Sequence, residues 1–271
     1  SRHVLMNMLK RAGAMGYSVN IGTAVEYFCF KSDSAPEPID KGGYFDLAPL
    51  DNASDLRRET VLTLEKMGIP VEYSHHEAAP AQQEIDLRFC DALSAADAVV
   101  TARLVIKETA HAQGVHASFM PKPIEGQPGS AMHVHQSLFD ERGNAFADTN
   151  DPDGMGLSSV AKSYIAGLLK YAPEYMLITN QYVNSYKRLV PGFDAPVVVS
   201  WGSRNPFGHG ACASLQAEQA LIDAHCGAQR RFGGESVFGV RCHAWSGPQG
   251  HRGRSRFMRA GRRKPVQAFS G

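Results

Sequence analysis

The run from Ser74 to Asp86 holds the densest group of side chains that could bind a divalent cation. Glu77 and Glu84 lie within it, and His75 and His76 directly precede Glu77. Mg²⁺ and Mn²⁺ prefer oxygen ligands, which carboxylates supply, so two glutamates beside expected strands are a candidate site. The alternative is a solvated acidic loop, and composition alone favours that alternative.

A second candidate is the pair His133 and His135, separated by one residue. In a strand, residues i and i+2 project to the same face, so both imidazoles point the same way. Zinc is the usual first interpretation of such a pair, yet no cysteine lies nearby and the other candidate ligands are carboxylates. An isolated pair of this kind is more often structural than metal-binding.

Arg188 and Asp194 form the third candidate, in a segment that begins at Asn184. The planar guanidinium of Arg188 suits a carboxylate or a phosphate, and Asp194 could accept a proton or hold a cation. The simpler alternative is a surface ion pair worth ~0–1 kcal/mol. Neither G-x-x-x-x-G-K-[ST] nor G-x-G-x-x-G occurs, so any nucleotide must bind without those phosphate loops.

The elements that must position these side chains are helices and strands in no regular β-α-β order. Apolar spacing predicts helices over residues 4–12, 54–67 (with Ser54 as the cap), 94–113 and 159–171. Strands are expected over residues 17–30, 71–77, 83–89, 116–120, 132–139 and 197–201, with a hairpin turn at 141–144. This mixture predicts an α+β fold.

The composition is that of an ordinary globular protein of 271 residues, with 43% hydrophobic and 20% charged residues. The formal net charge of +1 gives no general attraction to nucleic acid. No apolar run approaches the ~20 residues that span a bilayer, so neither nucleic acid nor a membrane is an expected partner. The five cysteines are widely spaced without a C-x-x-C pair, which favours reduced thiols and a cytoplasmic location.

Five runs, in the order in which they occur, resemble the catalytic domain of the glutamine synthetase family. They are Gly42–Phe45, His75–Glu77 with Glu84, Phe119–Pro123, Gly129–Leu138 and Asn184–Pro196. Phe119–Pro123 and the first nine residues of the last run are the most specific. The resemblance covers residues 1–205 and implies a curved antiparallel sheet with flanking helices, within the α+β class.

By this resemblance the protein is similar to type I enzymes that join glutamate and ammonia. Those enzymes use ATP to convert the γ-carboxylate of glutamate to a γ-glutamyl phosphate, from which ammonia displaces phosphate to give glutamine. Two Mg²⁺ or Mn²⁺ ions lie in their site and spread the charge of the transferring phosphoryl group. One ion aligns with Glu26, Glu77 and Glu84, and the second with His133 and two further glutamates.

The same resemblance implies positions for the other ligands. ATP aligns with Phe89, His135 and Ser137, while glutamate and the transferring phosphate align with Gly129 and Arg188. Asp194 stands in a flap where type I enzymes usually carry a glutamate that helps to take a proton from ammonium. Aspartate is shorter by one methylene and keeps the charge.

The resemblance also bears on assembly. Family members form stacked rings, so a homo-oligomer is expected of the intact parent. A neighbour's N-terminal β-domain completes each family site; that domain does not precede Ser1, so we expect this fragment to be inactive. Two other functions stay open: a γ-glutamyl ligase for larger amines such as polyamines, and a non-catalytic homologue.

The sequence departs from the family pattern at several positions. The first family strand carries glutamates at i and i+2, whereas here Glu26 is preceded by Ala24, which cannot bind a metal. Pro128 replaces an asparagine that contacts the substrate glutamate. The chain then reads Pro206-Phe207-Gly208-His209 where the family has an arginine-rich ATP segment, and the last ligand of the second ion falls at Cys226.

Residues 206–271 also differ from the rest of the chain in charge. They hold ten Lys and Arg residues and three acids, which leaves 18 bases and 24 acids in residues 1–205. One extra base in the codon for Pro206 would explain the change, because the restored frame can read Arg-Ser-Ala-Thr-Val-Arg-Val-Pro, as the family continues. We therefore expect residues 206–271 to be out of frame and poorly ordered.

The coding DNA tests this expectation directly. Reading the gene with one base removed at codon 206 should give a family-like continuation, including a second run, Asn-Pro-Tyr-Leu-Ala-Phe-Ala-Val-Met-Leu, in place of Glu235–Ala244. At Cys226 the restored frame allows only Val or Ala. The absence of any family-like run in the shifted frame would show that the C-terminal segment is genuinely different.

Overall fold

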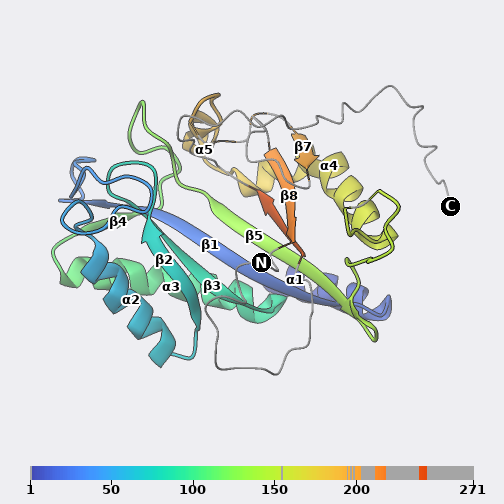
Figure 1. Ribbon diagram of the computed structural model, residues 1–271. Helices are drawn as coiled ribbons and strands as arrows, with labels where there is room; N and C mark the ends of the chain where they lie inside the picture. Colours follow the sequence, from blue (N-terminus) through green and yellow to red (C-terminus); the bar gives the residue numbers. More distant parts are fainter. Residues whose placement is uncertain are drawn as a thin grey trace.

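A six-stranded antiparallel sheet forms the middle of the molecule (Figure 1). The computed structural model describes residues 2–153, 155–193, 195, 197, 199–202, 211–217 and 238–242. The sheet has the order β2-β3-β1-β5-β6, and β4 pairs with the end of β1. Its strands are β1 (Ser18–Phe30), β2 (Val71–His76), β3 (Gln82–Asp91), β4 (His116–Ser118), β5 (Met132–Asp140) and β6 (Gly143–Asn144).

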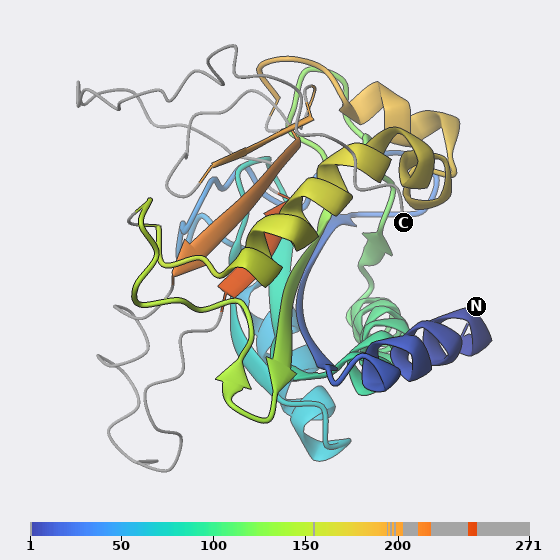
Figure 2. The same ribbon diagram turned by 90° about the vertical axis from the view of Figure 1, so that its right-hand side faces the viewer.

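Strand β1 is the centre of this sheet. It pairs with β3 along one edge and with β5 and β4 along the other, so both of its edges are hydrogen-bonded. Side chains alternate between the two faces of a strand, which sends Tyr27 and Cys29 one way and Ala24 and Glu26 the other. Figure 2 shows that β1 is strongly bent along its length, so the sheet is curved.

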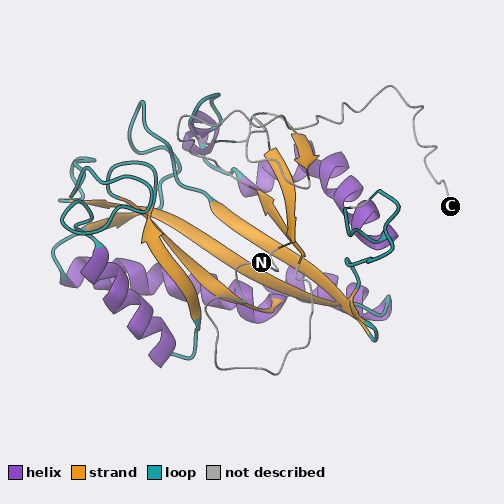
Figure 3. Ribbon diagram, in the orientation of Figure 1, coloured by secondary structure: helices purple, strands orange, loops and turns teal. Residues whose placement is uncertain are grey.

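Helices α2 (Ser54–Lys66) and α3 (Ala92–Ala112) cover the face that carries Tyr27 (Figure 3). The core between helices and sheet includes Tyr27, Ile85, Leu56 and Ile106, all fully or almost fully buried. Apolar burial of this kind contributes roughly 25 cal/mol per Å². Helix α1 (Arg2–Ala14) lies beside the sheet and buries no residue.

A second layer lies on the opposite side of the sheet. It comprises α4 (Ser159–Thr179), α5 (Val183–Arg188), β7 (Val199–Gly202), β8 (Ala211–Ala217) and β9 (Phe238–Cys242) (Figure 1). Ser158 caps α4 by accepting a hydrogen bond from the Ala161 amide. A small core of Phe146, Leu157 and Ile165 joins this helix to the loop after β6. The sheet therefore has helices on both faces, and α5 brings Arg188 to the face that carries Glu26.

The predicted α+β class is confirmed, and most expected elements are present within about two residues. The predicted cap at Ser54 is wrong: Ala53 is the cap residue, and it makes no side-chain cap bond. Helix α4 continues through Pro173 to Thr179, eight residues past the predicted end, and α5 was not predicted. Among the described helices, none has the length and apolar character needed to cross a bilayer.

The predicted disorder of residues 206–271 concerns a segment of which the structure describes β8 and β9. The remainder of that segment lies outside the described residues. The disorder of this segment therefore stays a prediction.

Buried charged groups tie the 40–52 segment to the β2–β3 hairpin. The Asp40 carboxylate accepts hydrogen bonds from the amides of Gly42, Asn52 and Ala81, and lies 3.0 Å from His76 Nε2. Burial by itself would raise the pKa of Asp40, but the hydrogen bond with His76 lowers it below its usual value. The hairpin that carries Glu77 and Glu84 is therefore anchored at its turn.

Asp51 and Arg57 form a second buried link. The Arg57 guanidinium makes two hydrogen bonds to the Asp51 carboxylate, at 3.0 and 2.5 Å, and a further one to Gln83 on β3. The Asp51 carboxylate also accepts from the Ala53 amide, which explains why the start of α2 needs no serine cap. This pair joins α2, the preceding loop and β3.

The substitution Arg57→Met should be strongly destabilising, because it leaves the buried Asp51 carboxylate without its cation. We expect a loss of about 3–5 kcal/mol in the free energy of unfolding, measured by urea titration. The control is Arg58→Met, since Arg58 is the next residue of α2 and is exposed; its effect should stay within about 0.5 kcal/mol. Equal losses in the two variants would contradict the assigned role of the buried pair.

Candidate metal centre and substrate site

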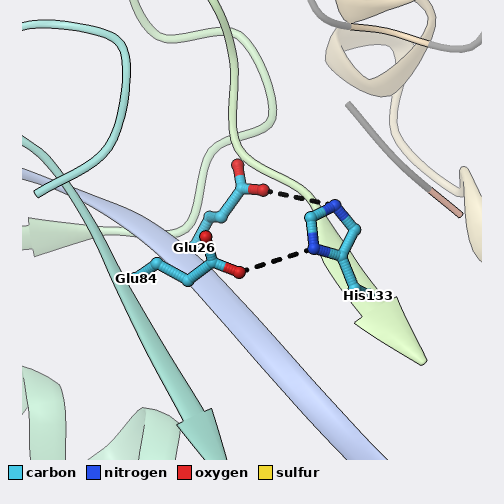
Figure 4. A group of neighbouring side chains, drawn as sticks. All are labelled: Glu26, Glu84 and His133. Carbon is cyan, nitrogen blue, oxygen red and sulfur yellow. Dashed lines mark ion pairs between the residues drawn. The ribbon is translucent and has the colours of Figure 1, made fainter. Parts of the chain in front are cut away.

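Glu26, Glu84 and His133 come together on the face of the sheet opposite α2 and α3. They lie on β1, β3 and β5, and Glu26 pairs directly with Glu84 in the strand register. His133 Nε2 lies 3.5 Å from Glu26 Oε1, and His133 Nδ1 lies 3.4 Å from Glu84 Oε1 (Figure 4). One ligand atom from each residue lies within 4.8 Å of the others, a spacing that one divalent cation can bridge.

The group is almost dry. Glu26, Glu84 and His133 are 4%, 2% and 3% exposed. Burial raises the pKa of Glu26, as does the nearby Glu77, while His133 and Arg188 act in the opposite direction. Two carboxylates buried side by side cost free energy unless positive charge balances them, and a bound cation is the most direct source of that charge.

Glu77, the residue directly after β2, extends the group. His75 Nε2 lies 3.3 Å from Glu84 Oε2, and His75 Nδ1 lies 3.8 Å from Glu77 Oε1. His75, Glu77 and Glu84 also form a set whose ligand atoms lie within 4.8 Å of one another. The Phe45 ring stacks on the His75 ring with a centroid distance of 4.4 Å, so Phe45 covers one face of the imidazole. The structure thus brings together all three glutamates predicted for one ion.

Gly129 and Arg188, predicted to hold glutamate, are neighbours, and hydrogen bonds connect them to Glu26 of the candidate metal centre. Arg188 Nε donates to the Gly129 carbonyl at 3.4 Å, and Gln82 Nε2 donates to the same carbonyl at 3.3 Å. Gln82 Nε2 also donates to Glu26 Oε2 at 2.8 Å, and the Ala131 amide donates to that oxygen at 3.0 Å. Gln82 therefore connects Glu26 to Gly129 and Arg188, the residues predicted to hold glutamate.

Phe89, His135 and Ser137, predicted for ATP, continue along the same face of the sheet. His133, His135 and Ser137 alternate along β5 and therefore project to one side. His135 and Phe89 flank Gly22: a Cβ at residue 22 would lie 3.8 Å from both His135 Cβ and Phe89 Cα. Ser137 is fully buried. The row begins at His133 of the candidate metal centre and leads away from Arg188.

Asp194, predicted as a catalytic residue, lies outside the described residues. Its neighbour Phe193 is described, and the Lys122 ammonium lies 4.0 Å from the Phe193 ring centroid. The Lys122 amide also donates a hydrogen bond to Asn184 Oδ1 at 2.7 Å, and Asn184 Nδ2 donates one to the Lys122 carbonyl at 3.0 Å. These contacts hold the start of the 190–196 segment near the 120–129 loop.

A further set of possible cation ligands, Asp40, Asp51 and His76, has a structural role instead. The Asp40 carboxylate accepts hydrogen bonds from three backbone amides, and Asp51 forms a salt bridge with Arg57. Their negative charge is therefore already balanced by hydrogen bonds and a guanidinium. Among the described residues, the group around Glu84 is the stronger candidate.

Two residues important to the site had been given no role in the sequence interpretation. His75 contacts both Glu77 and Glu84, and Gln82 links Glu26 to Gly129. Both lie in the Ser74–Asp86 run that had been singled out. The register of the β2–β3 hairpin could have indicated both residues. His75 pairs with Glu84, and Gln82 lies two residues before Glu84 on the same face of β3.

Comparison with known proteins places this chain in a family. Residues 1–207 match the family model of the glutamine synthetase catalytic domain, so the chain belongs to that family. A glutamine synthetase of Mycolicibacterium smegmatis is 54% identical over 209 residues, which cover 76% of this chain and 46% of the relative. One from Methanosarcina mazei is 51% identical over 208 residues, with 75% and 46% covered. The chain spans about half the length of these relatives.

Solved structures agree with the fold. A Plasmodium falciparum glutamine synthetase matches with a TM-score of 0.74 and 25% identity, over 90% of this chain and 51% of that one. A structure described as apo GmaS without ligand matches with a TM-score of 0.67 and 29% identity, over 75% and 49%.

Gly129 has no room for a side chain. A Cβ there would lie far inside contact distance of the Pro121 carbonyl oxygen and 3.2 Å from Arg188 Cγ. Gly129→Ala should therefore cost about 1–3 kcal/mol in the free energy of unfolding. The control is Gly167→Ala in α4, where nothing lies within 4 Å; it should stabilise by about 0.5–1 kcal/mol. A neutral Gly129→Ala in thermal or urea unfolding would contradict the close packing.

Proposed function

We propose that this chain is part of an ATP-dependent ligase that joins ammonia to the γ-carboxylate of glutamate through a γ-glutamyl phosphate. The observation that carries the proposal is the dry group Glu26, Glu84 and His133, connected through Gln82 to the Gly129–Arg188 pair. Family membership supports the same reaction, since the curated relatives are glutamine synthetases.

Glu26, Glu77 and Glu84 would hold Mg²⁺ or Mn²⁺, with His133 beside them. Such a cation supplies charge neutralisation on the oxygens of the transferring phosphoryl group. The chain's own task is to place the reactants on one curved face: ATP along Phe89, His135 and Ser137, and glutamate at Gly129. The burial of Glu26, Glu84 and His133 strengthens the electrostatic contacts that they make.

Arg188 would clamp a carboxylate or phosphate oxygen of the substrate. Its side chain is almost fully buried, and its Nε is turned toward the Gly129 carbonyl. Asp194 would accept a proton from the attacking amine as the adjoining segment covers the site. A segment of this kind also keeps water from the acyl phosphate, which would otherwise hydrolyse.

We also propose that residues 206–271 are out of frame and that the 271-residue chain does not catalyse the ligation reaction. The family match ends at residue 207, and the curated matches cover about three quarters of the chain, which supports a change of sequence near that point. The intact parent would be a homo-oligomer in the cytoplasm. The wide spacing of the cysteines, which favours reduced thiols, supports this location.

The first test is ligand binding by the chain as it stands. Isothermal titration in Mn²⁺ should detect glutamate, and Arg188→Gln should weaken glutamate binding by at least about tenfold, as expected for loss of a charge-assisted contact. Arg142→Gln, an exposed arginine with a single aspartate partner, is the matched control and should bind like the unchanged chain. A folded chain that binds neither Mn²⁺ nor glutamate would contradict the proposal.

The second test is phosphate release from ATP by the product of the gene with its frame restored at codon 206. Release should require glutamate and ammonium together, and the unaltered chain should give none. Phosphate release with putrescine in place of ammonium would identify a ligase for larger amines. Glutamate binding without phosphate release under any of these conditions would identify a non-catalytic homologue.

A further inference from the structure

The strand register places a residue without ligand atoms at the position beside His133. Ala24 of β1 is flanked by His133 on β5 and by Asp86 on β3, and all three project to the same face. Ala24 is 1% exposed. The family pattern has a metal-binding glutamate here, as a ligand of a second cation together with His133. The described residues therefore do not supply that ligand set.

His133 instead reaches across β1. Strands two places apart in a sheet are separated by about 9–10 Å, since neighbours lie about 4.8 Å apart. His133 Nδ1 nevertheless lies 3.4 Å from Glu84 Oε1, although β1 runs between β5 and β3 (Figure 4). The methyl group of Ala24 leaves this path open, whereas a glutamate there would project from the same face into it.

Both ring nitrogens of His133 are thereby turned toward the Glu26–Glu84 pair. Nε2 faces Glu26 and Nδ1 faces Glu84, at 3.5 and 3.4 Å. A second cation held by His133 and Asp86 would require the imidazole to turn away from Glu84. That rearrangement would take Nδ1 away from the Glu84 carboxylate and Nε2 away from the Glu26 carboxylate, the two groups that the ring now faces.

We infer that His133 serves the same cation as Glu26 and Glu84, and that this chain builds a centre for one divalent cation where its family has two. The inference rests on the proposed function and deepens it. The second positive charge of the site is then the Arg188 guanidinium, which is permanently protonated and acts on Glu26 from the substrate side. The remaining family ligand of the second ion aligns with Cys226, outside the described residues.

The test is a count of bound Mn²⁺ on the full chain, from the electron paramagnetic resonance signal of free Mn²⁺ during titration. The unchanged chain should bind one Mn²⁺, and His133→Asn should weaken that single site at least about tenfold, as expected for loss of a ligand. Asp86→Asn should leave the count at one and the affinity within about threefold. Two Mn²⁺ per unchanged chain would overturn the inference, as would unaltered affinity in His133→Asn.

A restored ligand provides the complementary measurement. Ala24→Glu should return His133 to a second site and raise the count to two Mn²⁺, and the combination with His133→Asn should lower it again. Ala24→Gln has the same size without the charge and should stay at one or below. Circular dichroism separates misfolded variants from folded ones. A folded Ala24→Glu chain that binds a single Mn²⁺ with unchanged dependence on His133 would contradict the role given to Ala24.

Failure of the proposed function would give a different result. In that case the chain could bind one Mn²⁺ through His133 and still show no glutamate binding, and the frame-restored product would release no phosphate. The count of cations and the ligation reaction are therefore judged separately.

Discussion

Two glutamate carboxylates buried side by side on the central strands are the constraint around which the structure is organised. Glu26 and Glu84 face each other across the β1–β3 register at less than 5% exposure. Like charges in a dry environment repel strongly, so such a pair persists only where positive charge and hydrogen-bond donors surround it. The neighbours of the pair come from three segments of the chain: Gln82 from β3, Arg188 from α5, and the Ala131 amide with the His133 ring from residues 131–133.

The outer parts of the fold keep that arrangement from relaxing. The β2–β3 hairpin is anchored at its turn by Asp40, and β3 is tied to α2 through Arg57. Behind the sheet, α2 and α3 pack on Tyr27 and Ile85, so the strands cannot shift by one residue without exposing this core. Packing on the helix-covered face therefore fixes the register of the strands. That register in turn sets the positions of the side chains on the other face, as a ligand site requires.

The site also illustrates how one small residue can change the use of its neighbours. By its position in the sequence, His133 aligns with the family's second cation, yet its ring lies against Glu26 and Glu84, which align with the first. We assign this difference to Ala24, whose side chain ends at the methyl group. Family membership therefore supports the proposed class of chemistry, while the proposed number of cations rests on residues specific to this chain.

Much of the fold could be predicted from the sequence, as could the residues of the candidate site, though not the contacts between them. Alternation and helical spacing gave the strands around Glu26 and His133 and the helices that cover them, because these patterns reflect which side of an element is buried. The short α5 and the extension of α4 past Pro173 were missed, because tertiary packing outweighs local propensity in such segments. The resemblance to a family singled out Glu26, Glu77, Glu84, Gly129 and Arg188 as one site.

Only the tertiary structure decided how those residues are connected. The hydrogen bonds from Gln82 to both Glu26 and Gly129, the contact of His75 with Glu84, and the reach of His133 across β1 depend on strand order and register. Those quantities are set by long-range pairing between segments up to about a hundred residues apart, which a linear pattern does not record. The sequence by itself determined which side chains are available for cation and substrate binding. Their grouping around one position followed from the folding of the sheet.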